Sequence, residues 1–561
     1  MNDLIKGKYD GCDQYTFADK LVKCVIFETM LQEKLLLVLA LLFAVCMLSM
    51  LSQKLKISYP IFLVIAGLLI SFIPAIPDIF LEPDIVFLIF LPPLLYAAAW
   101  NTSWKEFWKF RRPISLLAFG LVIFNSTAIA FLANAIIPDF PLALGFLLGA
   151  IISPPDAVAA TTVLQGLKIP KSVVTILEGE SLVNDATSLI VFRFALAAIF
   201  TGQFSFAKAS TEFFFVAGMG IIVGVAIAHV VYVVHRFLPT TPSIDTAITI
   251  VSPYLMYIGA EHFHWSGVMA VVSGGLFLSY RSHEIFAYDS RIQVYSFWEV
   301  IVFLLNGTVF ILIGLQLPQI VTGLEQYTMT HVILYAILIS VVTVVIRIIW
   351  VFPGAYLPRL LSKRIRTAEA RPAWQGVFLV AWSGMRGVVS LASALAVPLT
   401  LTNGQKFPHR DLLLFITFVV ILFTLVLQGL SLPWLIKKLN INDTGTEKDK
   451  EHEMAIRLRL ATAALDHMEN NYPDELTSID AYSRLKERYE RMIEIANKKL
   501  LKQENIDEVP KFLPKYRQML LELVTVRREE LIKLRSEQLY PDELLNNKEW
   551  ELDLEEARLN G

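Results

Sequence analysis

Long apolar runs constrain this chain more than any other feature of its sequence. Between about Leu35 and Ile436, runs of roughly 17 to 25 mainly apolar residues follow one another, separated by short polar stretches. A helix of that length crosses a hydrocarbon core about 30 Å thick. The composition agrees, because 55% of the 561 residues are hydrophobic and only 18% are charged. We therefore expect an all-α polytopic membrane protein.

Thirteen helices are predicted from these runs. They lie near residues 35–52, 58–74, 84–100, 113–137, 141–164, 172–201, 211–234, 244–261, 265–281, 294–317, 331–355, 374–398 and 412–436. The first run lacks a small-residue cleavage site, which indicates a retained span and not a signal peptide. After the last run the sequence turns polar and keeps a helical period. We predict an extracytoplasmic N-terminal tail (1–33), a transmembrane domain (34–438) and a cytosolic helical tail (439–561).

Basic residues are divided unequally between the connecting loops. The loops after odd-numbered helices hold sixteen: Lys54, Lys56, Lys105, Lys109, Arg111, Arg112, Lys168, Lys171, Arg236, Arg281, Arg291, Arg359, Lys363, Arg364, Arg366 and Arg371. The loops after even-numbered helices hold three: Lys208, Lys406 and Arg410. Cytoplasmic loops are enriched in Lys and Arg, so the odd-numbered loops are predicted to be cytoplasmic, with the N-terminus outside and the C-terminus inside. Four lysines of the N-terminal tail run against the rule: Lys6, Lys8, Lys20 and Lys23.

The sixth predicted helix carries carboxylates inside an apolar sequence. Its stretch "GESLVNDATSLIVFRFAL" places Glu180, Asn184 and Asp185 within two helical turns. Residues four apart share a helix face, so Glu180 aligns with Asn184, while Ser181 aligns with Asp185 on a second face. An ionised carboxylate at membrane depth costs several kcal/mol, and such residues face an interior cavity and commonly carry function. We expect both polar faces to point into the protein.

The fifth predicted helix contains "AIISPPDAVAATT", in which two prolines interrupt the helical pattern. Pro154 and Pro155 remove two backbone donors and disfavour helical geometry just before them, which frees carbonyl groups next to Asp156. Non-helical backbone at that depth is tolerated only where it lines a cavity or is buried in protein. A helix break is therefore predicted beside Asp156.

The twelfth predicted helix contains "LVAWSGMRGVVSLASA", in which Gly384 and Gly387 flank Arg386 and allow a second local break. If helix 7 links two halves, helices 5 and 12 are each fifth in their half, and the halves begin on opposite sides of the membrane. This arrangement is typical of inverted-repeat secondary transporters, whose interrupted helices meet at a midplane binding site.

These charges allow two interpretations. Glu180 and Arg386 could form a buried ion pair that holds helices together, because an unpaired buried charge is costly. With Arg386 so matched, no basic residue in these motifs remains for Asp156 or Asp185. Arg193, two turns further along helix 6, is an alternative partner for Asp185. Without a fixed partner, the two carboxylates suit a mobile cation or a proton.

The same residues offer ligands for such a cation. Burial favours the neutral form of a carboxyl group, so a carboxylate in a partly desolvated cavity binds either a proton or a dehydrated cation. Hard cations prefer oxygen ligands, which here are the carboxylates of Asp185 and Asp156, the Ser181 hydroxyl, the Asn184 amide and carbonyls near Pro155. Competition for one site, combined with alternating access, predicts exchange of a cation for a proton.

At these motifs the sequence resembles the NhaP/NHE branch of the monovalent cation/proton antiporters. The resemblance covers essentially the whole membrane region and rests on "FLPPLLYAAAW", "SPPDAVAA", "EGESLVNDATSLIVF", "FLLNGTVFILIGLQL" and "WSGMRGVVSLASALAVP" in this order. It implies an NhaA-like antiporter architecture of about thirteen helices, a homodimer in the cell (inner) membrane, and a moving core built from helices 5, 6, 12 and 13.

The resemblance also implies roles for individual residues. Asp185 would be the essential carboxylate that binds the transported sodium ion or a proton, with Asn184 as its motif partner. Glu180 and Arg386 would be a structural ion pair, and Asp156 and Ser181 would lie near the ion. The Asn184-Asp185 pair, in place of two aspartates, resembles the electroneutral group that exchanges one cation for one proton.

Two departures from the family pattern affect ion preference. Relatives often have Thr-Asp-Pro in helix 5, where this chain has Pro155, Asp156 and Ala157. Some relatives carry a glutamate in helix 3, where Tyr96 is here followed by Ala97.

Other functions are weighed against antiport. A cation channel or ion sensor on the same fold is the main alternative, although no run typical of a selectivity filter is visible. A membrane scaffold would not need paired carboxylates. No phosphate-binding loop or metal cluster is evident, which argues against a primary pump. We expect a transporter and not an enzyme, with no cofactor and no nucleic-acid partner. Arg347, within helix 11, is expected to serve packing or to line the cavity.

Overall fold

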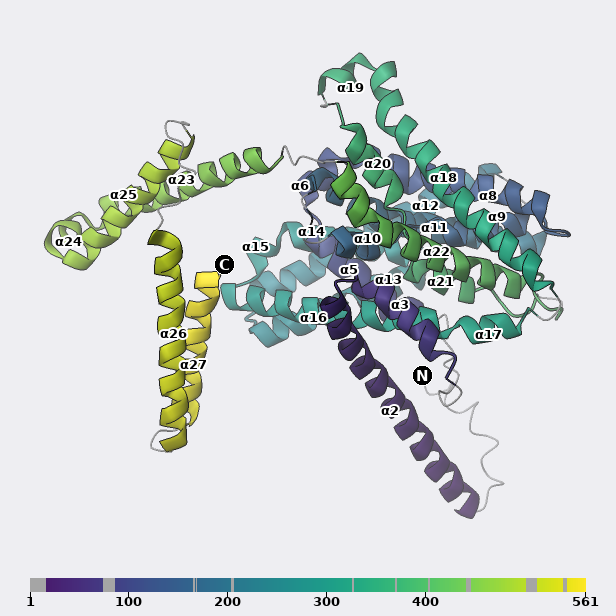
Figure 1. Cartoon of the computed structure of the whole chain (residues 1–561), viewed down its shortest axis with the longest axis horizontal. Coiled ribbons are helices and arrows are strands. Elements are labelled where there is room, and N and C mark those ends of the chain that lie inside the picture. The colour runs from purple at the N-terminus through teal and green to yellow at the C-terminus, as the bar shows by residue number, and fades with distance from the viewer. Residues whose placement is uncertain are drawn as a thin grey trace. The chain divides into compact units, whose positions relative to one another are not determined.

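The structure is a computed structural model of the chain, and its described residues fall into two units. It describes residues 17–73, 86–164, 167, 169–202, 206–324, 327–368, 371–401, 404–439, 445–500, 512–537 and 542–560. The first unit spans residues 1–443 and the second residues 444–561. Each unit is considered by itself (Figure 1).

The regular secondary structure of the membrane unit is helical in its described residues, apart from one isolated bridge between Thr400 and Lys406. Its helices are α2 (Phe17–Leu55), α3 (Tyr59–Ile70), η2 (Val86–Phe90), α5 (Leu91–Asn101), α6 (Trp104–Lys109), α7 (Arg111–Ser115), η3 (Leu116–Leu121), α8 (Val122–Ile136), α9 (Leu142–Ile152), α10 (Ala157–Leu164), α11 (Lys171–Thr201), α12 (Phe206–Phe237), α13 (Pro242–Glu261), α14 (Gly267–Tyr280), α15 (Ser282–Ile285), α16 (Tyr288–Leu315), α17 (Leu317–Thr322), α18 (Met329–Leu361), α19 (Lys363–Ala368), α20 (Trp374–Trp382), α21 (Val388–Leu395) and α22 (Arg410–Lys438).

Every one of the thirteen predicted spans coincides with one helix or with two or three consecutive helical segments. Eight helical stretches in the described residues are long and apolar enough to cross a membrane, and shorter apolar helices supply further spans. The all-α polytopic class is therefore confirmed. The first helix begins earlier than predicted, because α2 starts at Phe17, although its strongly apolar part runs from Leu35 to Leu55. Residues 1–16 of the predicted N-terminal tail lie outside the described residues.

Two apolar cores hold the membrane unit together, and helix α11 contributes to both. One core is formed chiefly by α3, α8, α9, α10, α18, α20, α21, α22 and the C-terminal half of α16. The other is formed by α5, α12, α13, α14 and the N-terminal half of α16. On α11, Leu177 and Phe192 pack into the first core, whereas Leu182 and Ile190 pack into the second. The helix that carries the predicted site therefore lies where the two cores meet.

Helices α3 and α16 cross at unusually short range because glycines face each other at the contact. A Cβ atom on Gly67 would lie 2.3 Å from the carbonyl oxygen of Ile311, and one on Gly314 would lie 2.3 Å from that of Val64. Small residues allow membrane helices to approach until their backbones touch. Both clashes are with backbone, which cannot move aside as a side chain can.

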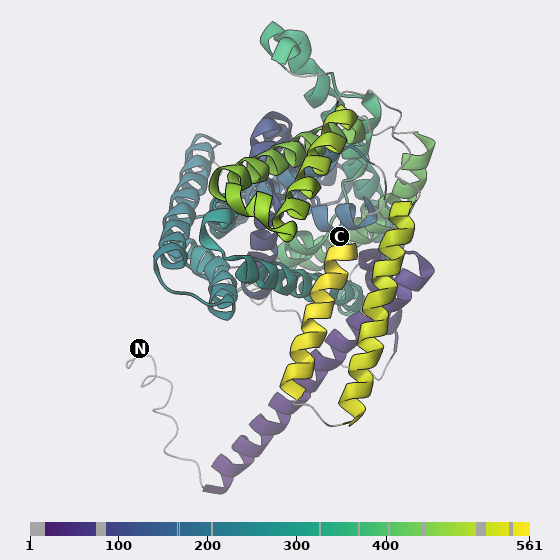
Figure 2. The same ribbon diagram turned by 90° about the vertical axis from the view of Figure 1, so that its left-hand side faces the viewer.

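The second unit consists of polar helices joined by ion pairs. Its helices are α23 (Gly445–Asn471), α24 (Pro473–Ser478), α25 (Asp480–Leu500), α26 (Phe512–Glu537) and α27 (Asp542–Asn560). Lys486 of α25 pairs with Glu469 of α23 at 2.7 Å, and Arg527 of α26 pairs with Glu555 of α27 at 2.7 Å. Helices α26 and α27 run side by side in both views (Figures 1 and 2). Exposed pairs of this kind contribute little individually, so apolar contacts between the paired helices must supply most of the stability.

The glycine crossing leads to a first prediction. Gly67→Ala should lower the free energy of unfolding by about 1 to 3 kcal/mol, because the added methyl group forces α3 and α16 apart. Thermal unfolding in detergent measures the loss. Gly218→Ala in α12 is the control: no atom lies within 4 Å of its added Cβ, and alanine favours a helix over glycine by about 0.5 to 1 kcal/mol. Equal stability of the two variants would contradict the close crossing.

Candidate ion-binding site

The helix predicted fifth along the chain is interrupted beside Asp156. Helix α9 ends at Ile152 and α10 begins at Ala157, with a non-helical segment between them. A continuous helix would bond the backbone N–H of Asp156 to the carbonyl of Ile152. That N–H instead donates to the carbonyl oxygen of Met385 at 2.7 Å. The break therefore exchanges a bond within its own helix for a bond to a second helix.

The second helix is itself interrupted at Met385. Helix α20 ends at Trp382 and α21 begins at Val388. A Cβ atom at Gly387 would lie 2.0 Å from Oδ2 of Asp156, so only glycine permits this approach. The two interrupted helices therefore touch at their breaks, and Asp156 lies at the contact.

Asp156 caps the half-helix that follows it. Its Oδ1 accepts hydrogen bonds from the backbone N–H groups of Val158 at 2.8 Å and Ala159 at 3.3 Å, which are otherwise unpaired at the start of α10. A carboxylate at a helix N-terminus also complements the positive end of the helix dipole. Its other oxygen, Oδ2, is buried and accepts no hydrogen bond from the described residues. One oxygen is thus structural, and the other remains open to a ligand.

The side chain of Arg386 binds the carbonyl ends of the two half-helices α9 and α20. Its Nε donates to the carbonyl oxygen of Ile152 at 2.8 Å, and its Nη1 donates to the carbonyl oxygen of Gly384. Its backbone N–H donates to Oγ1 of Thr424 in α22 at 3.1 Å. The carbonyl of Ile152 is the one left without a helical donor by the proline break. A cation at these carbonyl ends balances the negative ends of the helix dipoles.

The predicted ion pair between Glu180 and Arg386 is wrong. Glu180 is paired with Arg347 of α18, with Nη1 at 2.5 Å from Oε1 and Nη2 at 2.8 Å from Oε2. Both side chains are 1% exposed. Arg347 also donates to the carbonyl oxygen of Val380 in α20 at 3.0 Å. The two-pronged guanidinium of Arg347 fits the carboxylate, whereas the donors of Arg386 are taken by the carbonyl ends.

Arg347 therefore has a larger role than its position in the sequence predicted. It was expected to serve packing, yet it neutralises a fully buried carboxylate. One signal in the sequence pointed to it: Arg347 is a lone cation within the apolar stretch 332–358, and an isolated membrane-depth cation requires a partner.

The alternative partner for Asp185 is also excluded. Arg193 of α11 forms a two-pronged pair with Glu261 of α13, with Nη2 at 2.8 Å from Oε1 and 2.7 Å from Oε2. This pair is partly exposed, with 45% of the Arg193 side chain and 28% of the Glu261 side chain accessible. Among the described residues, no arginine or lysine forms an ion pair with Asp185.

Ser181, Asn184 and Asp185 lie on α11 facing the break of the other helix. The hydroxyl oxygen of Ser181 accepts a bond of 3.4 Å from the backbone N–H of Ala157, the residue next to Asp156. Asp185 is one turn further along the same face and is 7% exposed. Asp185 therefore lies on the face of α11 that approaches the break at Asp156. The amide oxygen and nitrogen of Asn184 are buried and make no hydrogen bond among the described residues.

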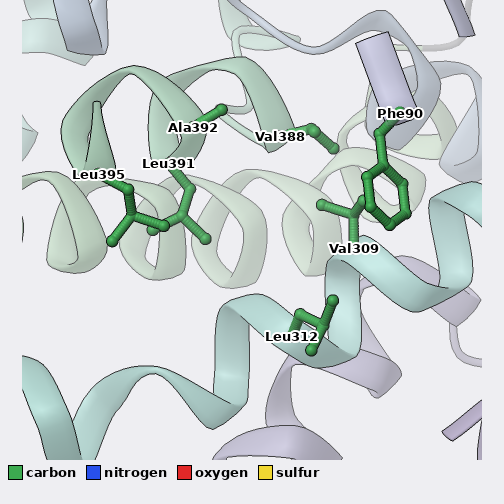
Figure 3. A pocket seen from close by; sticks show the side chains of 7 residues that line it. All are labelled: Phe90, Val309, Leu312, Val388, Leu391, Ala392 and Leu395. Carbon is green, nitrogen blue, oxygen red and sulfur yellow. The ribbon is translucent and has the colours of Figure 1, made fainter. Parts of the chain in front are cut away.

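The face of α21 that packs against α16 offers no room for an ion. Val388, Leu391, Ala392 and Leu395 there line a small cavity against α16, with a volume of about 10 Å³ (Figure 3). Its remaining lining side chains, from η2 and α16, are also apolar: Phe90, Val309 and Leu312. A cavity holds water only where polar partners are present. This cavity therefore offers no ligand to an ion.

Comparisons with known proteins assign the chain to a family. The profile of the sodium/hydrogen exchanger family, which describes its transmembrane region, matches residues 38–438. The chain belongs to the sodium/hydrogen exchanger family. It is therefore a multi-pass membrane transporter and not an enzyme, and the crossing of the two interrupted helices is the candidate ion-binding site of an exchanger.

Two relatives illustrate the similarity. The chain is 33% identical over 438 residues to a "sodium, potassium, lithium and rubidium/H(+) antiporter" of Bacillus pumilus, which covers 76% of this chain and 65% of the relative. The present chain thus spans slightly less than two thirds of the length of that relative. It is 31% identical over 478 residues to the Na(+)/H(+) antiporter ApNhaP of Aphanothece halophytica, covering 84% of this chain and 87% of the relative.

The fold matches a solved exchanger structure. The sodium proton antiporter MjNhaP1 of Methanocaldococcus jannaschii superimposes with a TM-score of 0.56 over 71% of this chain and 99% of that chain. The sequence identity is 21%, so the likeness concerns the fold. The antiporter architecture expected from the motifs is confirmed by this match.

The correction of the buried pair is testable with a double-mutant cycle. Removing either charge strands the other, so Glu180→Gln and Arg347→Gln should each lower the free energy of unfolding by about 3 to 5 kcal/mol. The double variant should lose much less than the sum, because the two residues are coupled. Unfolding in detergent measures all three. Glu261→Gln, in the partly exposed pair, is the control and should cost no more than about 1 kcal/mol. Stronger coupling of Glu180 to Arg386 than to Arg347 would restore the original pairing.

Proposed function

We propose that the chain exchanges sodium, or another monovalent cation, for protons across the cell membrane, with the two ions competing for Asp185. The observation that carries this proposal is the contrast between the buried charges. Glu180 has a fixed cation in Arg347, whereas Asp185 pairs with no basic side chain among the described residues. A buried carboxylate without a fixed partner requires a mobile positive charge.

The transported cation would be held by oxygen atoms from two helices. Asp185 and Asn184 supply a carboxylate and an amide from α11, and the buried Oδ2 of Asp156 supplies an oxygen from the break. The Ser181 hydroxyl is the fourth candidate ligand, since its oxygen already lies beside the start of α10. Such an all-oxygen set suits a hard cation. Sodium is the transported ion here and not a resident metal.

The charges around the crossing favour one-for-one exchange. Glu180, Asp156 and Asp185 are acidic, while Arg347 and Arg386 are basic, so full ionisation of these five side chains leaves one negative charge. One sodium ion or one proton neutralises it. Replacing one with the other then moves no net charge, which makes the exchange electroneutral.

Alternating access would arise from the position of Asp185 between the two apolar cores. An α-helix turns about 100° per residue, which places Asp185 between the α11 face holding Leu177 and Phe192 and the face holding Leu182 and Ile190. Movement of one core past the other would expose Asp185, which lies at their boundary, first to one side of the membrane and then to the other. Helices α9, α10, α11, α20, α21 and α22 would form the moving body, within a homodimer.

The proposed topology follows the distribution of basic residues. Residues 34–438 would form the transmembrane exchanger domain in the cell (inner) membrane. The N-terminus would lie outside, and the helical tail of residues 439–561 would lie in the cytoplasm.

Asp185→Asn tests the site assignment. The variant should fold but lose exchange, because an amide neither binds a proton at working pH nor neutralises a cation. Proton movement in everted vesicles, recorded after addition of sodium, potassium or lithium, should fall to the level of vesicles without the protein. Ser188→Ala is the matched control, since Ser188 bonds only to the Asp185 carbonyl at 3.0 Å within the helix, and it should retain exchange. Undiminished exchange by the asparagine variant refutes the role of Asp185.

Voltage dependence tests the stoichiometry and separates an exchanger from a channel. With the membrane potential clamped by valinomycin and potassium, sodium-driven proton movement should keep the same rate at different potentials. A rate that follows the potential would indicate either unequal charge exchange or a conductive pore. Ion flux without any proton movement would favour the channel.

A further inference from the structure

A large cavity lies in the membrane unit apart from the ion-binding residues. Its volume is about 1160 Å³, and its walls come from α6, α7 and η3 on one side and from α12 and α14 on the other. The lining residues from α12 and α14 include Ile221, Val225 and Leu276. Ile221 is 43% exposed and Val225 is 37% exposed, so the cavity is open to the surroundings of the helices. In a membrane those surroundings are lipid.

The cavity extends along one face of α14. Lining residues recur there at helical spacing: Met269, Val272, Ser273, Leu276, Phe277 and Tyr280. From the first to the last of these, eleven residues at 1.5 Å each give a length of about 16 Å. This equals about half of a hydrocarbon core 30 Å thick. The cavity therefore has the length of one leaflet.

Cations gather at one end of the cavity only. Arg281 follows the last lining residue of α14, and Arg111 and Arg112 lie at the start of α7. All three arginines belong to loops on the same predicted side of the membrane, the side rich in Lys and Arg. Deeper along the cavity, the walls are formed by apolar side chains such as Phe119 and Leu276. The cavity thus changes from basic to apolar along its length.

Two tryptophans mark the basic end as the level of the headgroups. Trp104 and Trp108 of α6 line the cavity, are 40% and 54% exposed, and stack with ring centroids 5.6 Å apart. Exposed tryptophans are enriched at the membrane–water interface. The guanidinium of Arg111 lies 5.0 Å from the ring centroid of Trp108, and its Nη1 donates to the Trp108 carbonyl at 2.8 Å. The interface therefore coincides with the cations.

One of the arginines at this end has no carboxylate partner among the described residues. Glu284 accepts a bond from Arg281 at 3.1 Å, and Glu106 pairs with Lys109 at 3.6 Å. Arg111 pairs with no carboxylate among the described residues and is exposed. Among the described residues, none that lines the cavity is acidic. A cation would be repelled from such an entrance, so the cavity is unsuited as the route of the transported ion.

We propose that this cavity binds an anionic phospholipid of the cytoplasmic leaflet. Its headgroup phosphate would bind Arg111, with Arg112 and Arg281 nearby, and its acyl chains would fill the apolar length beside α12 and α14. Basic pockets between membrane helices on the cytoplasmic side bind anionic headgroups, and arginine binds phosphate with two parallel hydrogen bonds. The lipid would touch α11 through Val183, which is next to Asn184. The inference does not depend on which cation is transported.

Lipid retention and thermal stability test the proposal. The purified full-length protein is delipidated and then supplied with phosphatidylglycerol or phosphatidylcholine; bound lipid is counted by native mass spectrometry, and melting temperature is recorded. The protein should prefer phosphatidylglycerol and melt at a higher temperature with it. The Arg111→Gln/Arg112→Gln variant should weaken that preference roughly tenfold or more, given about 1 kcal/mol for each basic residue near an anionic surface.

Two further variants separate charge from shape. Lys363→Gln/Arg366→Gln removes two exposed cations from α19, away from the cavity lining, and should keep the wild-type preference. Val225→Trp fills the apolar part and should lower retention of both lipids without changing the surface charge.

Three results would overturn the inference. Equal retention of the two lipids by the wild-type protein would remove the headgroup site. Equal loss of preference in both double variants would show a diffuse surface charge effect. Stabilisation by inorganic phosphate equal to that by phosphatidylglycerol would show an anion site that does not require acyl chains.

Discussion

The contact between two broken helices is the constraint on which the rest of the membrane unit depends. One backbone bond, from the N–H of Asp156 to the carbonyl of Met385, joins the two breaks. Within a membrane each unpaired backbone group costs several kcal/mol, so neither helix can be interrupted unless its partner is interrupted at the same depth. Proline supplies one break and glycine the other, and each depends on the other to satisfy its backbone.

The crossing also explains why each fixed charge is where it is. The four half-helix ends bring together two carbonyl ends and two N–H ends. Arg386 bonds the carbonyl oxygens of Ile152 and Gly384, and Asp156 bonds N–H groups at the start of α10. The helix ends are therefore neutralised by the Arg386 guanidinium and by one of the two carboxylate oxygens of Asp156. Glu180 and Arg347 neutralise each other outside this arrangement, which leaves Asp185 as the carboxylate without a fixed partner.

Hydropathy predicted the helices well because burial in lipid acts on each span separately. The breaks at Pro154, Pro155, Gly384 and Gly387 could be read in the same way, since backbone chemistry is local. The arginine that pairs with Glu180 could not be predicted in this way. The predicted spans contain Arg193 on the same helix as Glu180 and two arginines on other helices, Arg347 and Arg386. Nothing in helical spacing says which of the last two faces Glu180. That choice depends on how α18, α20 and α11 pack, and on carbonyl groups that occupy Arg386 only once the two breaks meet. The cavity beside α14 could not be predicted from the sequence either, because its walls come from distant segments of the chain.

The ion pairs of α11 differ in strength in the way that the proposed movement requires. Glu180 and Arg347 lie within one apolar core and are 1% exposed, so separating them would strand buried charge. Arg193 and Glu261 instead join α11 to α13 of the other core, and both are partly exposed. Water can solvate those two charges once they part, so breaking the pair costs about 1 kcal/mol or less. The strong pair thus holds α11 to the body that would move, and the weak pair is the one that movement would break.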